Sequence, residues 1–212
     1  MTHGRSLIVL RHGQTTQNAS GIYQGHTDTE MSVRGLEQAE SAAGVLAPRA
    51  PVRIVSSDLR RAVVTAHALG KATGLTVEID PDLREIDVGS WAGLSHAEVQ
   101  ARYPRESSAI AAGLDRRRGE DGETVAEVGS RTRRVAEGVA GSLEQGQCAV
   151  VVTHGMAARV MAATLTGWPP SEAVTRLPAL SNCCWGELRV PPERWSVLSW
   201  NVGDQDSATA PI

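Results

Sequence analysis

Two histidines in this chain stand directly after apolar runs, where polar side chains can do chemistry. The run 7–10 leads into Arg11 and His12, and the run 148–153 leads into His154. In open α/β sheets, ligands bind beyond the carboxyl ends of the strands. A glycine follows each histidine and lets the chain turn sharply there. We therefore expect both histidines to face one crevice, although they lie far apart in the sequence.

Two further pieces place charged side chains after apolar runs. Arg60 and Arg61 follow the run 52–56, in the first turn of an expected helix. A cation there opposes the helix dipole, which suits an anion bound between the guanidinium group and the helix amides. The stretch "LREIDVGSW" follows a third run and carries Glu85 and Asp87. The site is thus expected to hold histidines, arginines and a carboxylate.

This set of side chains indicates phosphoryl transfer. A phosphoryl group needs cations and donors around its equatorial oxygens, and arginine offers a planar, bidentate fork. A neutral histidine can be the nucleophile, and a carboxylic acid can protonate the leaving alkoxide. The sequence has no metal-ligand motif, so we expect no metal and no cofactor, with arginines taking the place of magnesium.

The elements that would position these residues alternate between strand and helix patterns. The expected strands cover residues 7–11, 52–56, 76–80 and 148–153, with a final hairpin or edge pair at 184–190 and 195–200. The expected helices start at an N-cap Ser32, at Asp58 (running to about Leu69), at 95–103 (ended by Pro104), at a Thr124–Glu127 capping box (ended by Gly146) and at Met156. This alternation predicts a three-layer α/β/α sandwich with a mostly parallel central sheet.

Length and composition set limits on the class of protein. The chain has 212 residues, of which 41% are hydrophobic, and a net charge of -3. We expect one domain over residues 1–202 and a disordered tail over 203–212. A slightly acidic chain without an apolar stretch of roughly 20 residues favours neither nucleic acid nor membrane. Three cysteines without C-x-x-C spacing fit reduced thiols and a cytoplasmic location.

The motifs resemble those of one family when they are taken in order. They are "LRHGQTTQN", "MSVRGLEQA", "VSSDLRRAVVTA", "LREIDVGSWAGL", "DGET" and "VVVTHG". The tripeptide "RHG" alone is common by chance, whereas the ordered set is specific and spans roughly residues 7 to 165. The chain therefore resembles the histidine phosphatase superfamily, also called the phosphoglycerate mutase-like family.

The resemblance implies catalytic roles for five residues. His12 matches the nucleophile that becomes phosphorylated, and Arg11, Arg61 and His154 match the rest of the phosphate pocket. Arg61 is the matching arginine because it directly precedes the alanine of the motif. Glu85 matches the proton donor, which later activates water.

The resemblance also implies substrate-binding positions. Asn18 matches a phosphate-contacting residue after the first motif, and Gln24 and Gly25 lie where the family lines its substrate pocket. The backbone N–H of Gly155 is expected to be a further phosphate donor.

Phosphatases and mutases share these motifs, and the compact chain favours a phosphatase. The family's mutases also favour Trp-Asn where this chain has Gln17-Asn18. A closer likeness, in "LPALSNCCWGEL" and "ERWSVLSWN", is to the glucosyl-3-phosphoglycerate phosphatases as a subgroup. It implies a small phosphorylated acid or sugar as substrate, with glucosyl-3-phosphoglycerate as the named candidate. A phosphoglycerate mutase and a non-catalytic phospho-ligand-binding module remain the alternatives.

Some features stay open at this point. The segment between Pro104 and Asp121 does not match the subgroup, and it is expected to border the substrate. Its run Arg116–Arg118 is either a solvated turn or, if the loop folds over the pocket, a site for a second acidic group. The C-terminal edge strands allow a homodimer without showing one.

Overall fold

The computed structural model of the chain describes residues 4–190 and 194–203. Its centre is a six-stranded sheet in the order β3-β2-β4-β1-β5-β6. The strands are β1 (Ser6–Arg11), β2 (Arg53–Ser56), β3 (Val77–Ile79), β4 (Cys148–Thr153), β5 (Trp185–Arg189) and β6 (Ser196–Val202). All six predicted strands are therefore confirmed, with ends that shift by one or two residues.

The sheet is mostly parallel, as predicted. Strand β1 pairs in parallel with β4, β4 with β2, and β2 with β3. Strand β5 runs antiparallel to β1, and β6 runs antiparallel to β5, which confirms the expected final pair. The four parallel strands consequently present their carboxyl ends at the same edge of the sheet.

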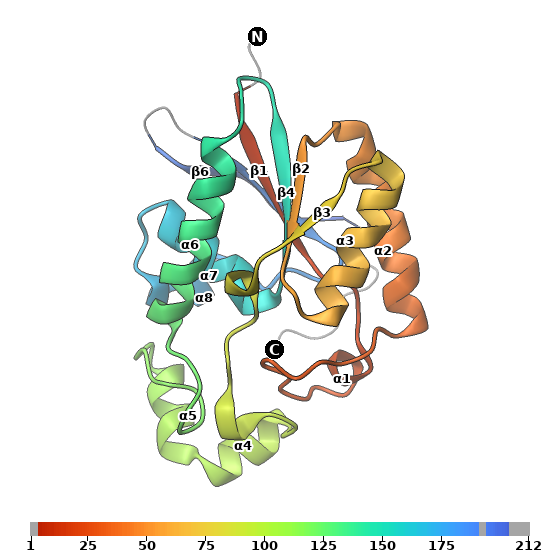
Figure 1. Ribbon diagram of the computed structural model, residues 1–212. Helices are drawn as coiled ribbons and strands as arrows, with labels where there is room; N and C mark the ends of the chain where they lie inside the picture. The colour runs from red at the N-terminus through yellow and green to blue at the C-terminus, as the bar shows by residue number, and fades with distance from the viewer. Residues whose placement is uncertain (1–3, 191–193, 204–212) are drawn as a thin grey trace.

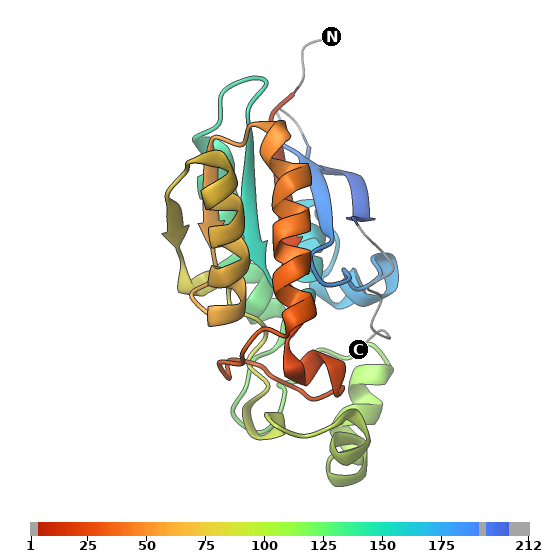
Figure 2. The same cartoon turned by 90° about the vertical axis from the view of Figure 1, so that its right-hand side faces the viewer.

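Helices cover both faces of the sheet and complete the predicted three layers (Figures 1 and 2). Helices α2 (Val33–Leu46) and α3 (Arg60–Thr73) pack on one face. Helices α6 (Val125–Gly141) and α7 (Gly155–Leu165) pack on the other, with the short α8 (Ala173–Arg176) beside α7.

Strand β1 shows why the central strands are apolar throughout. Its side chains alternate between the two faces, so Leu7 and Val9 pack in the core under α6 and α7 while Ile8 and Leu10 pack under α2 and α3. All four side chains are buried. A polar residue in the middle of a strand covered on both faces is costly, so the polar side chains of such a strand lie at its ends, as Arg11 does at the carboxyl edge.

The chain between β3 and α6 forms an excursion beyond that edge, where α4 (His96–Arg102) and α5 (Pro104–Ala111) project from the body (Figure 1). The expectation that Pro104 ends a single helical stretch was incomplete. Pro104 begins α5, because proline at the first helical position loses no intrahelical hydrogen bond. The remaining short elements are α1 (Thr16–Ala19) and the 3₁₀ turns Ala47–Arg49, Pro81–Leu83, Gly89–Trp91 and Pro170–Glu172.

Three predicted helix limits were wrong, one at a start and two at an end, although the caps at Ser32 and Thr124 are confirmed. Asp58 does not cap α3, whose N-cap is Leu59, because its carboxylate accepts two hydrogen bonds from Arg84 at 2.7 and 2.5 Å. Helix α3 also continues past the expected end near Leu69, to Thr73. Helix α6 ends at Gly141, and Gly146 instead forms the turn before β4.

Two further points concern the limits of the chain. Of the predicted disordered tail 203–212, only Gly203 is described, and 204–212 lie outside the described residues. Among the described helices, none combines the length and the apolar character that crossing a bilayer requires.

Candidate active site

His12 follows the last residue of β1, and its backbone N–H donates to the carbonyl of Thr153 at 3.0 Å. Its ring Nδ1 lies 2.7 Å from the carbonyl oxygen of Gly13. A carbonyl can only accept, so Nδ1 carries the proton in the neutral ring and Nε2 keeps its lone pair. The ring is therefore held in the tautomer that a nucleophilic Nε2 requires.

His154 follows β4 and is the N-cap of α7. Its Nδ1 accepts a hydrogen bond from Nε of Arg61 at 3.2 Å, and its Nε2 donates to the hydroxyl of Ser57 at 2.9 Å. The centroids of the His12 and His154 rings lie 5.0 Å apart. The two strand-end histidines thus face the same site, as the sequence predicted.

Burial sets the charge of both rings. Desolvation, followed by the nearby positive charge of Arg61, lowers the pKa of His12 and the pKa of His154 well below the ordinary histidine value. Their side chains are 3% and 0% exposed. Both rings are consequently neutral at pH 7, which leaves the His12 lone pair available.

Arg61 supplies a positive charge beside the two rings. Its terminal nitrogens donate to the carbonyls of Thr27 at 2.8 Å and Gly25 at 2.9 Å. Burial lowers the pKa of Arg61 to about 10, so the guanidinium group remains charged at neutral pH. Arg60 points away and pairs with Glu30 at 3.2 Å. The structure therefore brings Arg61, and not Arg60, to the site.

Arg11 is the second buried cation. It donates to the carbonyl of Leu180 at 2.5 Å, and its Nε has no hydrogen-bond partner within residues 4–190 and 194–203. A buried N–H without a partner is costly, so this donor is available to an acceptor atom of a ligand.

Glu85 reaches the same place from the excursion. Its carboxylate accepts the backbone N–H groups of Met156 at 3.1 Å and Ala157 at 3.0 Å, in the first turn of α7. A Cβ added to Gly155 would lie 3.6 Å from the Arg11 guanidinium carbon and 3.7 Å from a Glu85 carboxylate oxygen. The carboxylate, the guanidinium group and the start of α7 therefore converge, and Glu85 does not pair with Arg84.

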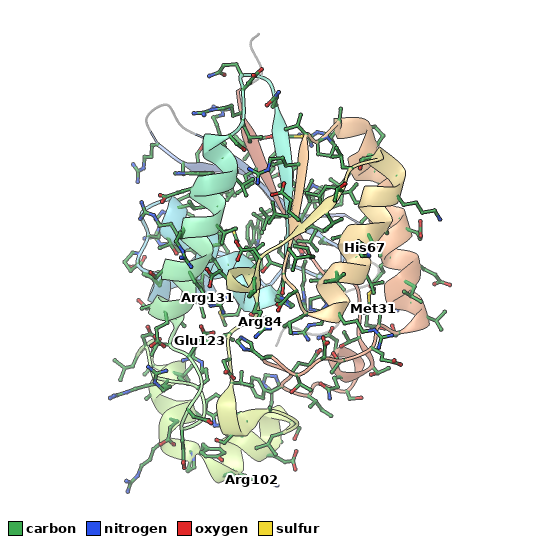
Figure 3. The ribbon with its side chains drawn as sticks, viewed as in Figure 1. Met31, His67, Arg84, Arg102, Glu123 and Arg131 are labelled. Carbon is green, nitrogen blue, oxygen red and sulfur yellow. The ribbon has the colours of Figure 1, made fainter. Side chains whose placement is uncertain are left out.

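Arg131 of α6 holds the backbone that carries Glu85 (Figure 3). Its guanidinium group donates to the carbonyls of Asp82, Arg84 and Glu85 at 2.7, 2.6 and 2.9 Å. It also forms two hydrogen bonds of 2.8 Å with the carboxylate of Glu123. One side chain thus fixes the strand-to-excursion junction.

Two neighbours complete this clamp. The carboxylate of Glu123, which pairs with Arg131, also accepts the backbone N–H of Asp87 at 2.9 Å. The ring Nε2 of His26 donates to the Glu85 carbonyl at 2.8 Å. His26 is therefore a neighbour of the Glu85 backbone.

Two amide side chains are oriented by their oxygen atoms. Asn18 Oδ1 accepts from the Thr15 N–H and from Asn182 Nδ2, and Gln24 Oε1 accepts from the hydroxyls of Thr15 and Thr29. In the part of the chain that the structure describes, neither amide nitrogen has a protein partner. Both residues line the cavity, so the two NH₂ groups are available to a ligand.

The two predicted glycines differ in what they contribute. The N–H of Gly155 is the first of α7 and has no backbone acceptor among the described residues, which suits an anion. Gly25 has φ +51°, and a Cβ there would lie 2.7 Å from a methyl group of Val88. The carbonyl of Gly25 accepts a hydrogen bond from Arg61, so Gly25 both lines the cavity and positions the Arg61 guanidinium group.

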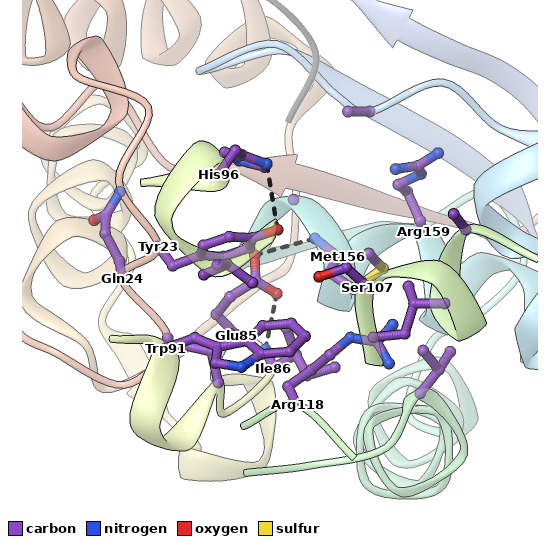
Figure 4. Close-up of a pocket in the computed structure, with 18 of the residues that line it drawn as sticks. Tyr23, Gln24, Glu85, Ile86, Trp91, His96, Ser107, Arg118, Met156 and Arg159 are labelled. Carbon is purple, nitrogen blue, oxygen red and sulfur yellow. Dashed lines mark hydrogen bonds between the residues drawn. The ribbon is translucent and has the colours of Figure 1, made fainter. Parts of the chain in front are cut away.

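These groups form one end of a cavity of about 630 Å³. We call this the phosphate end. Its lining residues are Arg11, His12, Asn18, Arg61, Glu85 and Gly155, and we include the buried His154, whose ring lies beside that of His12. The outer end is formed by α4, α5 and the loop that follows them, together with Tyr23 (Figure 4). It comprises Tyr23, Val88, Trp91, His96, Ile110, Leu114 and Arg118.

The sequence reasoning missed several of these residues. Ser57 and Asn182 stand inside motifs that were recognised, "SSDLRRA" and "LPALSN", but nothing in the pattern distinguishes them as contacts of the histidines. Arg131 gives no local signal, because its partners lie in other segments. Arg118 was left open between a solvated turn and the pocket, and the structure places it in the cavity wall with 7% of its surface exposed.

Comparison with known proteins points to one family. The profile of the "Histidine phosphatase superfamily (branch 1)" matches residues 7–203. The chain is 39% identical to a glucosyl-3-phosphoglycerate phosphatase of Mycobacterium tuberculosis, over 96% of this chain and 97% of that protein. It is 32% identical to a Yersinia enterocolitica protein named "Probable phosphoglycerate mutase GpmB", over 92% and 90%.

A solved structure agrees with the sequence match. The mycobacterial glucosyl-3-phosphoglycerate phosphatase in complex with VO3 superposes with a TM-score of 0.86 at 38% identity, over 94% of this chain and 100% of that one. The fold and the order of the motifs are therefore shared along nearly the whole chain.

Proposed function

The chain belongs to the histidine phosphatase superfamily (branch 1) and is a phosphatase, and on that premise we propose that it hydrolyses a small phosphomonoester through phosphorylated His12. One observation carries the proposal. The deprotonated Nε2 of His12 stands among Arg11, Arg61 and His154 in a closed, buried cluster that faces a cavity.

In the first step, Nε2 of His12 attacks phosphorus, so that an N–P bond forms while the bond to the substrate's alcohol oxygen breaks. Glu85 gives its proton to the departing oxygen. Arg11, Arg61, the amide of Asn18 and the N–H of Gly155 stabilise the equatorial oxygens. His154 adds a neutral ring that Arg61 and Ser57 hold in place.

In the second step, Glu85 takes a proton from water, whose oxygen attacks phosphorus as the N–P bond breaks. Inorganic phosphate leaves, and His12 returns to its neutral form. The chain's own cations carry the charge of the transferred group, so the proposed reaction needs no metal and no other cofactor. Across the described ranges, no three His, Cys, Asp or Glu side chains gather as a metal site would require.

The proposed substrate is a small phosphorylated acid or sugar, with glucosyl-3-phosphoglycerate as the first candidate. The relatives of that name support it, since they match over nearly all of both chains. The cavity supports it as well, because its volume extends well beyond the phosphate end along Tyr23 and Trp91. Gln24 and Gly25 then line the wall on which the substrate rests.

The test is phosphate release in EDTA from glucosyl-3-phosphoglycerate, 3-phosphoglycerate, sugar phosphates, phosphoserine and p-nitrophenyl phosphate. We expect the largest kcat/KM for glucosyl-3-phosphoglycerate, together with an acid-labile phosphoenzyme trapped on His12. Equal, weak phosphate release from all compounds would contradict glucosyl-3-phosphoglycerate as the preferred substrate. Release of nothing would overturn the reaction.

A phosphoglycerate mutase is the second candidate, favoured by the relative of that name. A mutase would interconvert 2- and 3-phosphoglycerate after priming by a bisphosphate, and the phosphoenzyme would resist water. Incubation with both acids separates the two, because the phosphatase yields inorganic phosphate and the mutase yields the isomer.

Three expectations about the setting of the protein stay predictions. Cys148, Cys183 and Cys184 are buried thiols that form no disulfide, which fits a reducing cytoplasm. A homodimer could use β6, whose outer edge no described strand pairs with. Nucleic acid is not expected as a partner.

A further inference from the structure

Arg118 is a buried cation at the outer end of the cavity. Its side chain is 7% exposed and points into the cavity near Trp91 and Ser107 (Figure 4). One terminal nitrogen donates to the backbone carbonyl of Arg116. The guanidinium group carries five N–H donors, so this contact leaves most of them for other partners.

No acidic side chain within the described residues lies within 4.0 Å of Arg118 to balance its charge. Asp115 belongs to the same loop, but its carboxylate accepts the backbone N–H groups of Val125 and Ala126 at 2.8 and 2.9 Å. Asp115 thereby holds the start of α6. A buried charge without an ion-pair partner is costly, and an anionic ligand relieves that cost.

The neighbouring cationic side chains of this loop behave differently. Arg117 pairs with Glu127 at 2.7 Å on the surface, and Arg116 is exposed. Only the third arginine of the run turns inward. The wall around Arg118 is mostly aromatic and aliphatic, with Ser107 and Asp115 as polar neighbours. The Asp115 carboxylate is already held by two backbone N–H groups, so the guanidinium group is the cation that this region offers to a ligand.

We propose that Arg118 is a specificity-determining residue that binds the carboxylate of the substrate while the phosphate occupies the other end of the cavity. The proposal rests on the proposed phosphatase function and names the chemical class it selects, a phosphomonoester with a second, carboxylate anion. Two charge-assisted hydrogen bonds from a planar guanidinium group match a carboxylate in geometry. The phosphate end of the cavity then binds the phosphate of the substrate, and Arg118 at the outer end binds the carboxylate of the same molecule.

The experiment compares two substrates that differ only in the carboxylate, 3-phosphoglycerate and glycerol 3-phosphate. We expect the wild-type protein to favour 3-phosphoglycerate in kcat/KM by about 10- to 100-fold. Arg118→Gln should remove most of this preference, mainly through a higher KM for 3-phosphoglycerate. Arg118→Lys keeps the charge and should retain part of the preference.

Arg116→Gln is the matched control, since it removes a cation from the same loop but from its exposed side. It should leave the substrate preference as in the wild type. A purely structural role of Arg118 would lower kcat/KM for both substrates by the same factor. Thermal melting of each variant shows whether the fold is retained.

The outcomes separate this proposal from the proposed function. A wild-type protein that hydrolyses both compounds without preference overturns the role of Arg118 and leaves the phosphatase standing. An Arg118→Gln variant that keeps the full preference does the same. If the preference disappears in Arg159→Gln instead, then Arg159, another buried arginine of the cavity wall, binds the carboxylate and the proposal is wrong.

Discussion

The phosphate end of the cavity is built mainly from the ends of β1 and β4 and the starts of α3 and α7, with Glu85 reaching in from the excursion between β3 and α6. The outer end is built mostly from that excursion itself, together with Tyr23. Backbone hydrogen bonds on both sides fix the phosphate end, as in the bond from His12 to Thr153. The outer end has only short helices, α4 and α5, and side chains that pack on one another. A phosphatase can therefore keep one chemistry while the excursion changes what it accepts.

The sharpest test of this division is His12→Ala. It should lower kcat/KM by about 10⁴-fold or more for every phosphomonoester, because the other histidine of the site, His154, has both ring nitrogens engaged by Arg61 and Ser57. Phosphate release and trapping of the phosphoenzyme measure it. His67→Ala, on the exposed side of α3, should change neither. A variant that lost activity toward one substrate only would show that the phosphate end also selects substrates.

Glu85→Gln should have the next largest effect, about 10²- to 10⁴-fold in kcat for an alkyl phosphate. The leaving alkoxide of such a substrate needs a proton, whereas nitrophenolate leaves without one. The loss should therefore be much smaller for formation of the phosphoenzyme from p-nitrophenyl phosphate. A burst of nitrophenolate followed by slow turnover would be seen in rapid-mixing experiments. Equal losses with both substrates would contradict the assignment of Glu85 as the acid.

Arg131→Met tests whether the junction between the two ends positions Glu85. Removing the donors to three carbonyls and to Glu123 should lower kcat for alkyl phosphates by roughly 10- to 100-fold and leave KM nearly unchanged. Its effect on p-nitrophenyl phosphate burst formation should be small, like that of Glu85→Gln.

Arg134→Met is the control for this positioning role. Arg134 lies on the same helix and pairs with Asp82 in an exposed contact. It should retain wild-type kinetics, since exposed ion pairs contribute little. A rise in KM with unchanged kcat in Arg131→Met would instead mean that Arg131 supports substrate binding and not the position of the Glu85 carboxylate.

The same division explains how far the sequence could be used for prediction. His12, Arg61 and His154 were predictable because each follows a strand or opens a helix in a motif of fixed spacing. Arg131 was not, since its effect depends on carbonyls that the fold brings to it. The direction of Arg118 was also undecided, because three consecutive arginines in a loop carry no periodicity. The fold class followed from alternating patterns, while the second excursion helix was missed because proline can start a helix as well as end one.

The smallest expected effect concerns stability and pH, and it contrasts the buried histidines with His96 at the outer end. Burial lowers the pKa of His12 and the pKa of His154 well below their unfolded value near 6.5. As pH falls through 6.5, the unfolded chain therefore binds protons that the folded chain cannot, and the free energy of unfolding decreases. Each buried histidine accounts for at most about 1.4 kcal/mol between pH 7.5 and 5.5.

Urea unfolding in phosphate-free buffer at these two pH values measures the effect. In the His12→Asn/His154→Asn double variant, the loss of stability on acidification should be smaller than in the wild type by roughly 1 to 3 kcal/mol. Burial also lowers the pKa of His96, but that ring is largely exposed, so His96→Asn should reduce the pH dependence by less. If His96→Asn reduced the pH dependence of the free energy of unfolding as much as the double variant does, the histidines at the two ends of the cavity would not differ in their effect on stability. The assignment of the pH dependence to the deeper burial of the phosphate end would then be wrong.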